Sequence, residues 1–409
     1  MRILHLSLTN FRNYSRLELD LPQGVVLLQG DNAQGKTNLL EAIYYLSRAR
    51  SPRTGADREL LNWLALEEDL PFARLVAQVE RGDETAQIEI SLVQNSTRGP
   101  NGNGMALRKH IRVNGANKRA VDMVGLLRTV LFLPQDIDMV AGAPHIRRRY
   151  LDDTISQLDS RYYQELQRYS RVLMRRNYLL KSLRGRSDDA GQLTFWDQRL
   201  VQHGVYVIAR RQQVIQQLDA SVQDVHRKLT GDRERLRLEY CASVRTEAPP
   251  GAVYQIGLPT ELVDGGLPEL SPELRDVAAS FAAQLQEARS KELEQGMSIL
   301  GPHRDDLRFL VDGVDMAIYG SRGQQRTIAL SMKLAEVQLM VQGNNDKPVL
   351  LLDDVISELD LLHRRCLLDA IDQAQQVIIT ATDVAPYGAE FLERAVQWRV
   401  CAGRIQSAV

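Results

Sequence analysis

The chain has 409 residues, of which 25% are charged and 44% are hydrophobic, and its formal net charge at pH 7 is −1. These proportions are typical of a globular protein and exclude a disordered chain, while the length exceeds what one hydrophobic core normally supports. Three cysteines without metal-ligand spacing predict reduced thiols, and no apolar run approaches the roughly 20 residues that a membrane-spanning helix needs. We therefore expect a cytoplasmic protein of more than one domain that has no membrane partner.

A phosphate-binding loop is predicted near the start of the chain. An apolar run at 25–28 predicts a buried strand, and apolar residues at helical spacing over 38–46 predict a helix. The sequence between them fits G-x-x-x-x-G-K-[ST], a loop whose backbone amides and following helix bind phosphate groups. Its predicted nucleotide-binding residues are Gly30, Asp31, Asn32, Ala33, Gln34, Gly35, Lys36 and Thr37. We expect Lys36 to reach the β- and γ-phosphates of ATP and Thr37 to bind Mg²⁺. The alternative is a glycine turn with a chance lysine.

Strands are predicted after this helix. The stretches 74–80, 86–93 and 110–113 have the composition of antiparallel strands. A segment rich in glycine and asparagine at 95–104 predicts a hairpin tip or an insertion. Together they predict an antiparallel β subdomain.

From about residue 144 the pattern becomes helical, with a Pro/Gly-rich interruption at 248–272. Alternating strand and helix patterns return near residue 300. We therefore expect an α/β head formed by residues 1–143 and 300–409, with residues 144–299 inserted as a helical arm domain.

The first part of this insertion is basic. Residues 147–186 contain eleven Lys or Arg residues against four acidic ones, with five tyrosines interleaved. A basic stripe is the footprint expected of a protein that binds the phosphate backbone of nucleic acid. The alternative is a solvated helix face whose tyrosines pack on the core. No base-reading motif is visible, so binding would not depend on base sequence.

Two further motifs lie near the end of the chain. Ser321 precedes an apolar-periodic helix at the position of an N-cap, where a hydroxyl and backbone amides can bind an anion. The alternative is an ordinary capped helix. An apolar run at 349–352 leads into Asp353 and Asp354, at the strand end where parallel sheets hold ligand groups. We expect Asp353 to hold Mg²⁺ and Asp354 to act as the general base for an attacking water.

Taken together, these motifs resemble those of ABC ATPases, and the wider sequence resembles the RecF family, the bacterial recombination-mediator ATPases of the SMC-like branch. The resemblance covers nearly the whole chain, from residue 3 to about 383. The stretches that carry it are Leu6–Tyr14, Pro134–Asp136, Arg147–Asp152, Gly301–Asp306, Ser321–Gln325 and Asp353–Asp360. It implies an SMC-like P-loop ATPase head assembled from both chain ends.

The resemblance also implies site roles that the residues alone do not establish. An ATP-dependent homodimer would place four signature residues of one copy against the γ-phosphate held by the other, namely Ser321, Arg322, Gly323 and Gln324. Gln135 would sense Mg²⁺ and the γ-phosphate and assist catalysis, and residues 51–54 would lie near the base and ribose. The implied DNA contacts are Arg147, Arg148, Arg149, Arg175 and Arg176.

At the level of function, the resemblance implies a weak, DNA-stimulated ATPase that binds duplex and gapped DNA near single-strand gaps. It would assist RecA loading together with RecR and RecO. His303 is equally compatible with a functional and a structural role.

Three alternatives remain open. An ABC transporter subunit would usually have its signature closer to the phosphate loop, a glutamate after the aspartate, and a switch histidine where this chain has Thr380–Asp383. An SMC-like end-processing ATPase would usually carry a metal-binding nuclease module. An ATP-binding scaffold that barely hydrolyses is compatible with Asp354 in place of glutamate.

Overall fold

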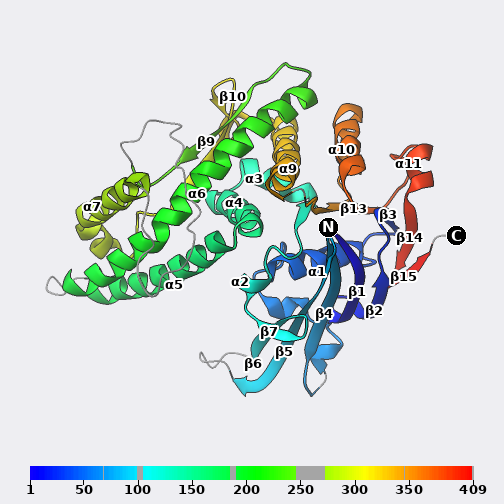
Figure 1. Cartoon of the computed structure of the whole chain (residues 1–409), viewed down its shortest axis with the longest axis horizontal. Coiled ribbons are helices and arrows are strands. Elements are labelled where there is room, and N and C mark those ends of the chain that lie inside the picture. Colours follow the sequence, from blue (N-terminus) through cyan, green and yellow to red (C-terminus); the bar gives the residue numbers. More distant parts are fainter. Residues whose placement is uncertain (68, 99–104, 185–189, 246–271, 345, 408–409) are drawn as a thin grey trace. The chain divides into compact units, whose positions relative to one another are not determined.

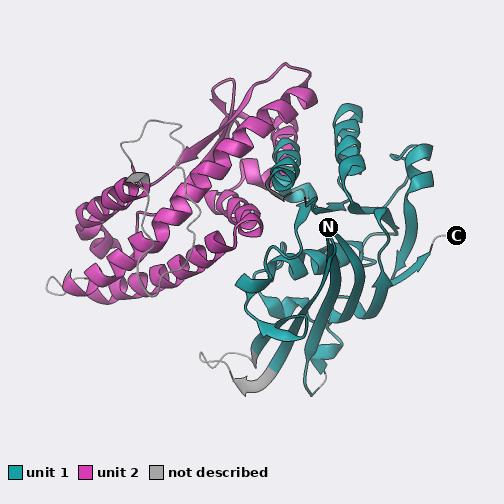
Figure 2. Cartoon of the chain, in the orientation of Figure 1, with its two compact units in different colours: residues 1–136, 330–409 teal, residues 137–329 magenta. Residues whose placement is uncertain are grey.

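The computed structural model describes residues 1–67, 69–98, 105–184, 190–245, 272–344 and 346–407. The expected hairpin tip at 95–104 and the Pro/Gly-rich segment at 248–272 fall largely outside these residues. Contacts divide the chain into a first unit, residues 1–136 with 330–409, and a second unit, residues 137–329 (Figure 2). The second unit extends beyond the arm expected at 144–299 at both ends.

A six-stranded antiparallel sheet forms one layer of the first unit, with spatial order β2-β1-β4-β5-β6-β7. The strands are β1 (Arg2–Phe11), β2 (Tyr14–Asp20), β4 (Phe72–Arg81), β5 (Glu84–Arg98), β6 (Met105–Val113) and β7 (Ala116–Lys118). The predicted strands at 74–80, 86–93 and 110–113 are confirmed.

The second layer is a mainly parallel sheet with the order β15-β14-β3-β13-β12-β8. Its strands are β3 (Gly24–Gln29), β8 (Thr129–Phe132), β12 (Val349–Asp353), β13 (Gln376–Ala381), β14 (Val396–Cys401) and β15 (Arg404–Ser407), and only β15 is antiparallel to its neighbour. Ile378 lies beside Val26 on one side and Leu351 on the other. All residues of β12 and β13 are buried, which explains their continuous apolar runs.

Helix α1 (Lys36–Arg48) contacts strands of both layers, including β4 and β12 (Figure 1). Because it packs on both sides, nearly all of its side chains are buried. Its start is therefore fixed at the carboxyl edge of the parallel sheet, where β3 and β12 both end.

The second unit is mostly helical, as its sequence predicts. Its long helices are α4 (Pro144–Leu158), α5 (Ser160–Leu183), α6 (Ala190–Thr230) and α7 (Pro272–Gln295). Asp159 caps α5 by accepting a hydrogen bond from the Tyr162 amide at 3.0 Å. Tyr169, Leu200 and Phe281 belong to the core that joins α5, α6 and α7. A three-stranded sheet of order β11-β10-β9 completes the unit: β9 (Leu236–Cys241), β10 (Asp306–Val311) and β11 (Val314–Asp315).

The remaining elements are shorter, apart from α9, within which the division between the units falls. They are η1 (Asp57–Leu60), η2 (Ala65–Glu67), α2 (Ala120–Met123), η3 (Pro134–Ile137), α3 (Asp138–Ala141), α8 (Met316–Tyr319), α9 (Arg322–Asn344), η4 (Ile356–Glu358), α10 (Leu361–Gln373) and α11 (Ala389–Arg394). None of the described helices is long and apolar enough to cross a membrane.

Candidate nucleotide-binding site

A pocket of about 440 Å³ in the first unit brings the predicted phosphate loop together with the two aspartates. The residues that line it are Asn32, Ala33, Gln34, Gly35, Lys36, Thr37, Asn38, Arg53, Pro134, Asp353, Asp354 and Thr380. Segments separated by more than 300 residues thus meet at the carboxyl edge of the parallel sheet, the usual place for ligands in such folds.

Positive φ angles and close neighbouring atoms explain the two glycines of the motif. Gly30 has φ +154°, and a Cβ there would lie 2.4 Å from the Val400 carbonyl oxygen. Gly35 has φ +114°, and a Cβ there would lie 2.5 Å from Nδ2 of Asn13. Since α1 begins at Lys36, directly after Gly35, the amides of its first turn face the loop. This geometry suits an anion such as phosphate.

The side-chain ammonium group of Lys36 provides a positive charge at the loop. Its Nζ donates hydrogen bonds to the carbonyl oxygens of Gly30 at 2.5 Å and Asp31 at 2.8 Å. Burial lowers the pKa of Lys36, and the carboxylates of Asp354 and Asp353 oppose that shift. The ammonium group is thus folded against the loop, next to where phosphate oxygens would lie.

Thr37 and Asp353 form the direct link between the two motifs. The Thr37 Oγ1 lies 2.8 Å from Oδ1 and 3.0 Å from Oδ2 of Asp353, and Thr380 Oγ1 donates to Asp353 Oδ1 at 2.9 Å. A hydroxyl and a carboxylate oxygen are the donors that Mg²⁺ takes from proteins when water and phosphate complete its shell. The residues present therefore fit magnesium.

Asp354 has a left-handed backbone, with φ +51°. Its amide donates to Thr380 Oγ1 at 3.0 Å, and Ser357 Oγ donates to its carboxylate at 3.1 Å. Thr382 Oγ1 lies 3.5 Å from the other carboxylate oxygen. The side chain lines the pocket with its direction fixed by neighbouring hydroxyls, as a proton acceptor for a bound water requires.

Of two further residues expected near the nucleotide, Arg53 lines the pocket and Gln135 does not. Gln135 is exposed in η3, and among the described pocket-lining residues its neighbour Pro134 appears instead. Arg53 lines the pocket and donates from Nη1 to Asn38 Oδ1 at 3.2 Å. Its segment is the one that the family resemblance places near the base and ribose.

Two turns that were not predicted to belong to the site form hydrogen bonds with the loop. In the β1–β2 turn, Asn13 donates from Nδ2 to the Gln34 carbonyl at 2.9 Å and accepts from Asn38 Nδ2 at 2.8 Å. In the β14–β15 turn, the Gly403 amide donates to the same carbonyl at 3.0 Å, and the Ala402 amide donates to Gln34 Oε1 at 2.7 Å. Gln34 therefore anchors the loop through both its backbone and its side chain. No local sequence signal identifies contacts between residues so far apart.

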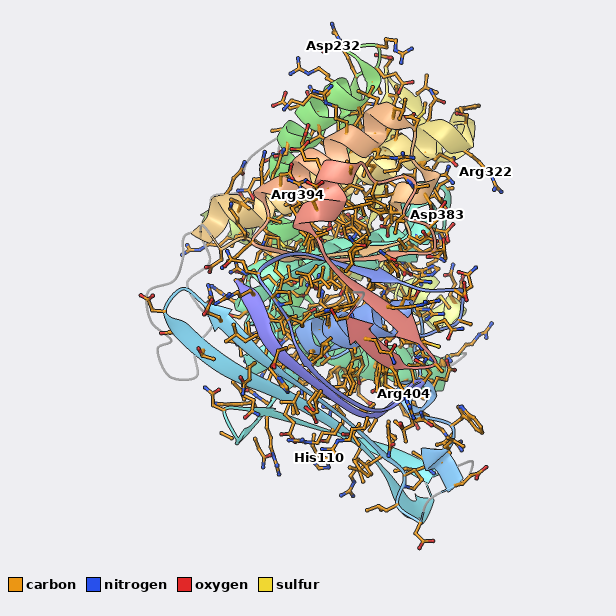
Figure 3. All side chains as sticks on the ribbon, turned by 90° about the vertical axis from the view of Figure 1, so that its right-hand side faces the viewer. His110, Asp232, Arg322, Asp383, Arg394 and Arg404 are labelled. Carbon is orange, nitrogen blue, oxygen red and sulfur yellow. The ribbon has the colours of Figure 1, made fainter. Side chains whose placement is uncertain are left out.

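The predicted signature residues lie in the second unit, at the start of α9. Ser321 accepts from the Gln324 amide at 3.3 Å, and Gln324 Oε1 accepts from the Ser321 amide at 3.1 Å, which confirms Ser321 as an N-cap in a capping box. Gln324 Nε2 also donates to Glu234 at 3.0 Å. Ser321, Arg322 and Gly323 are exposed, and Arg322 points away from the ribbon (Figure 3).

The arginines expected to contact DNA fall into two groups. Arg176 is completely buried, where it donates to Asp197, Glu292 and Ser298, and Arg147 is 6% exposed and binds Asp306 through two nitrogens. Burial and internal pairing remove both guanidinium groups from the surface, which corrects the expectation that they bind DNA phosphates.

Arg148, Arg149 and Arg175 are less buried than Arg147 and Arg176. Arg175 is exposed, and the Arg149 side chain is 41% exposed and 3.8 Å from Asp153. Arg148 is partly buried and donates from Nη1 to the Asp305 carbonyl at 2.7 Å. Burial lowers the pKa of Arg148, with the Arg211 charge adding to the shift.

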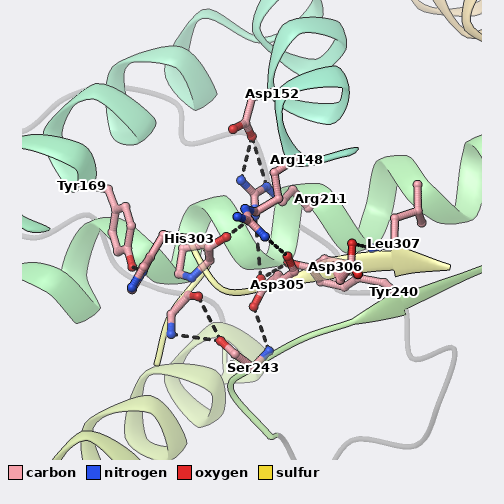
Figure 4. Close-up of polar contacts among 12 residues, drawn as sticks. Arg148, Asp152, Tyr169, Arg211, Tyr240, Ser243, His303, Asp305, Asp306 and Leu307 are labelled. Atoms are coloured by element: carbon pink, nitrogen blue, oxygen red, sulfur yellow. Dashed lines mark hydrogen bonds and ion pairs between the residues drawn. The ribbon is translucent and has the colours of Figure 1, made fainter. Parts of the chain in front are cut away.

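The neighbourhood of Arg148 is a buried polar network (Figure 4). Fully buried Arg211 donates from Nη2 to Asp152 at 2.8 Å and from Nη1 to the Pro302 carbonyl at 2.6 Å. Nearby, the Tyr169 hydroxyl lies 2.6 Å from Nδ1 of His303, and Nε2 of His303 lies 3.2 Å from the Ser298 carbonyl. His303 therefore has a structural position within the second unit.

Known proteins share this arrangement over the full chain. A family model described as RecF/RecN/SMC N terminal domain matches residues 2–392. The DNA replication and repair protein RecF of Chloroflexus aggregans is 44% identical over 99% of this chain and 99% of its own, and that of Roseiflexus castenholzii is 41% identical over 100% of both. The solved recombination mediator protein RecF-ATP of the RecFOR pathway matches with TM-score 0.80 and 29% identity over 100% of this chain and 97% of that chain.

Proposed function

This chain belongs to the RecF family of SMC-like ATPases, and we propose on that basis that it is an ATP-dependent DNA-binding protein of replication and repair. The observation that carries the proposal is the 2.8 Å contact between Thr37 Oγ1 and Asp353 Oδ1 beside Lys36. It joins a phosphate loop to an acidic strand end, as nucleotide hydrolysis requires. A solved relative at 29% identity is described as RecF-ATP, which supports nucleotide binding by this chain.

The proposed chemistry is hydrolysis of ATP to ADP and phosphate. The loop amides and Lys36 bind the phosphates and orient the γ-phosphate. Thr37 and Asp353 would hold Mg²⁺, which would supply positive charge to neutralise the phosphates. Asp354 accepts a proton from the attacking water as the water oxygen bonds to the γ-phosphorus and the bond to the ADP oxygen breaks. The family resemblance assigns Gln135 to the same water, although its side chain is exposed and does not line the pocket. Asp354 is shorter than the usual glutamate, so we expect slow turnover.

The proposed active state is a dimer. Ser321, Arg322, Gly323 and Gln324 of a second copy bind the γ-phosphate, so ATP joins the two copies and its hydrolysis releases them. The exposure of the first three of these residues and the amides at the start of α9 support this role.

The proposed substrate of the dimer is duplex DNA beside a single-strand gap. Arg149 and Arg175, with Arg148 at the edge of the buried network, are the predicted arginines that can still contribute charge to phosphate contacts. RecR and RecO are the proposed partners, and assisted RecA loading in the cytoplasm is the proposed outcome. The placement of a relative in the RecFOR pathway supports RecR and RecO as partners.

The test is ATP hydrolysis measured against protein concentration, with and without duplex DNA. We expect the specific rate to rise with concentration, because the site is completed by a second copy, and to rise further with DNA. Asp354→Asn should bind ATP but lose hydrolysis, while Lys36→Met should lose binding. A specific rate independent of both concentration and DNA would contradict the proposal.

A further inference from the structure

The second unit exposes three large apolar side chains close together along the chain. Met174 and Tyr178 of α5 are 71% and 79% exposed, and Phe195 of α6 is 52% exposed. A folded protein rarely leaves such side chains in water without a use when they form a contiguous surface. Helices α5 and α6 pack side by side (Figure 1), so the three residues belong to two helices that are in contact.

Ring contacts connect Arg175 of α5 to Phe195 and Arg199 of α6. Arg175 lies over the Trp196 ring at 5.7 Å from its centroid, and Trp196 meets Phe195 edge to face at 5.1 Å. Arg199 in turn lies 5.6 Å from the centroid of Phe195. On α5, positions 171, 174, 175 and 178 share one face by their spacing of three and four residues. We call this surface the α5–α6 platform and define it as Arg171, Met174, Arg175, Tyr178, Phe195 and Arg199.

The platform is positively charged. Arg171, Arg175 and Arg199 are exposed, whereas Glu165 and Asp197, the acidic residues nearest to them on the described parts of α5 and α6, are already paired. Glu165, the one acidic residue of α5, binds His203 and Arg168 at 2.6 and 2.8 Å, and Asp197 of α6 binds Arg176 and Arg289. A ligand with negative charge and flat apolar faces would therefore complement this surface.

We propose that the α5–α6 platform binds unpaired DNA bases, which stack on Tyr178 and Phe195 while their phosphates contact the three arginines. Exposed aromatic rings beside cations are the general means by which proteins bind single strands without reading sequence. Residues 171 to 178 span about 10 Å of helix, roughly the length of three stacked bases. The inference rests on the proposed DNA-binding function, and it assigns the single-stranded side of a gap to the α5–α6 platform, where Arg175 is shared with the proposed duplex contacts.

A protein partner is the competing occupant of such a surface. Unpaired DNA is favoured because all three charges of the platform are cationic and because two of its three large apolar side chains are aromatic. A peptide ligand would need acidic and apolar residues together, and nothing in the spacing of the arginines selects such a pattern.

The test uses the full chain with ATP and compares binding of a fluorescent oligo(dT) with that of a blunt duplex by anisotropy. The double variant Tyr178→Ala/Phe195→Ala should weaken oligo(dT) binding at least about 5-fold and leave blunt-duplex binding within about 2-fold. Tyr178→Phe, which keeps the ring, should bind oligo(dT) as the parent does. Trp63→Ala, which removes an exposed ring from the first unit, is the matched control and should have no effect.

Photocrosslinking gives a direct readout. Oligo(dT) that carries bromodeoxyuridine should crosslink to peptides containing Tyr178 or Phe195. Crosslinks confined to other peptides would overturn the proposal, as would unchanged oligo(dT) binding by the double variant. If the parent bound no blunt duplex, the proposed function would fail, whereas duplex binding without oligo(dT) binding would overturn only the platform.

Discussion

At the scale of single residues, His303 is held in its neutral form. Its Nδ1 accepts from the Tyr169 hydroxyl at 2.6 Å, and its Nε2 donates to the Ser298 carbonyl at 3.2 Å, which fits the tautomer protonated at Nε2. Burial lowers the pKa of His303 to about 4, and the charge of Arg304 adds to the shift. Protonation would remove the acceptor that the tyrosine hydroxyl uses.

This depressed pKa predicts a loss of stability in mild acid. The unfolded chain takes up a proton on this histidine near pH 6.5, while the folded chain resists until about pH 4. The free energy of unfolding should therefore be largest above pH 6.5 and should fall by about 2 kcal/mol between pH 7.5 and 5 through this residue. Urea unfolding at the two pH values measures the effect. His303→Gln should lose this part of the pH dependence, and an equal dependence in both proteins would contradict it.

The sequence motifs correctly predicted the charged residues and the threonine hydroxyl that meet in the pocket. The basic run, in contrast, led to a wrong prediction of DNA contact for Arg147 and Arg176. Lys36, Thr37, Asp353 and Asp354 stand in motifs whose chemistry is local, and the structure brings all four into one pocket. Arg176 stands in a basic run, yet its partner Glu292 lies 116 residues away. A charge run cannot show which of its members have buried partners, because those partners come from other elements.

At the scale of elements, the phosphate loop depends on the turns behind it. The carboxamide of Asn13 bridges the loop and the first turn of α1 through Gln34 and Asn38. These two hydrogen bonds fix both ends of the segment that would bind phosphate. Their loss should therefore lower the affinity for nucleotide.

We therefore predict that Asn13→Ala weakens ATP binding about 10-fold, since two hydrogen bonds of about 0.5–1.5 kcal/mol each are lost. The rate at saturating ATP should change little, because no group that touches the reacting atoms is removed. Calorimetric titration with ATP measures the affinity, and Asn117→Ala on exposed β7 is the control. An unchanged dissociation constant would show that the loop holds its shape without this turn.

Helices and strands with a clear apolar spacing could be predicted from the sequence. The elements that they contact in the fold could not. The strand before the loop and the helix after it follow from apolar spacing, and so do the antiparallel strands β4, β5 and β6. The place of the β14–β15 turn against Gln34 does not follow from any pattern, because backbone hydrogen bonds between distant turns are independent of side-chain type.

At the scale of the whole molecule, the exposed start of α9 is the surface on which proposed dimerisation depends. Ser321→Arg puts a long cation where the proposed partner phosphate binds and also removes the capping hydroxyl, at a cost of about 1 kcal/mol. ATP binding by the single copy should persist, because the pocket in the first unit contains no residue of this segment.

We expect Ser321→Arg to remain monomeric with ATP under conditions where the parent dimerises. Light scattering after size exclusion, with and without ATP, measures the change. Ser321→Thr keeps a capping hydroxyl and should still dimerise. ATP-driven dimers of the arginine variant would remove the composite-site proposal.

The overall architecture could be predicted only in part. Local patterns indicate an α/β protein with a helical insertion, and the family resemblance supplied the type of ATPase head. The order β15-β14-β3-β13-β12-β8 is not local, because β3 lies between two strands that follow it by more than 340 residues. Such pairings are decided by the packing of the complete sheet.

That strand order has a consequence for how the protein is made. The phosphate loop leaves the ribosome early, yet the Ala402 amide that holds Gln34 is translated 368 residues later. Until residue 376 is translated, β3 has neither of its neighbours β13 and β14, and its unpaired edges are open to wrong pairing. A nascent or prematurely terminated chain would therefore carry the nucleotide motif without the complete sheet around it, so we expect affinity for ATP to develop only after the β14–β15 hairpin has been translated.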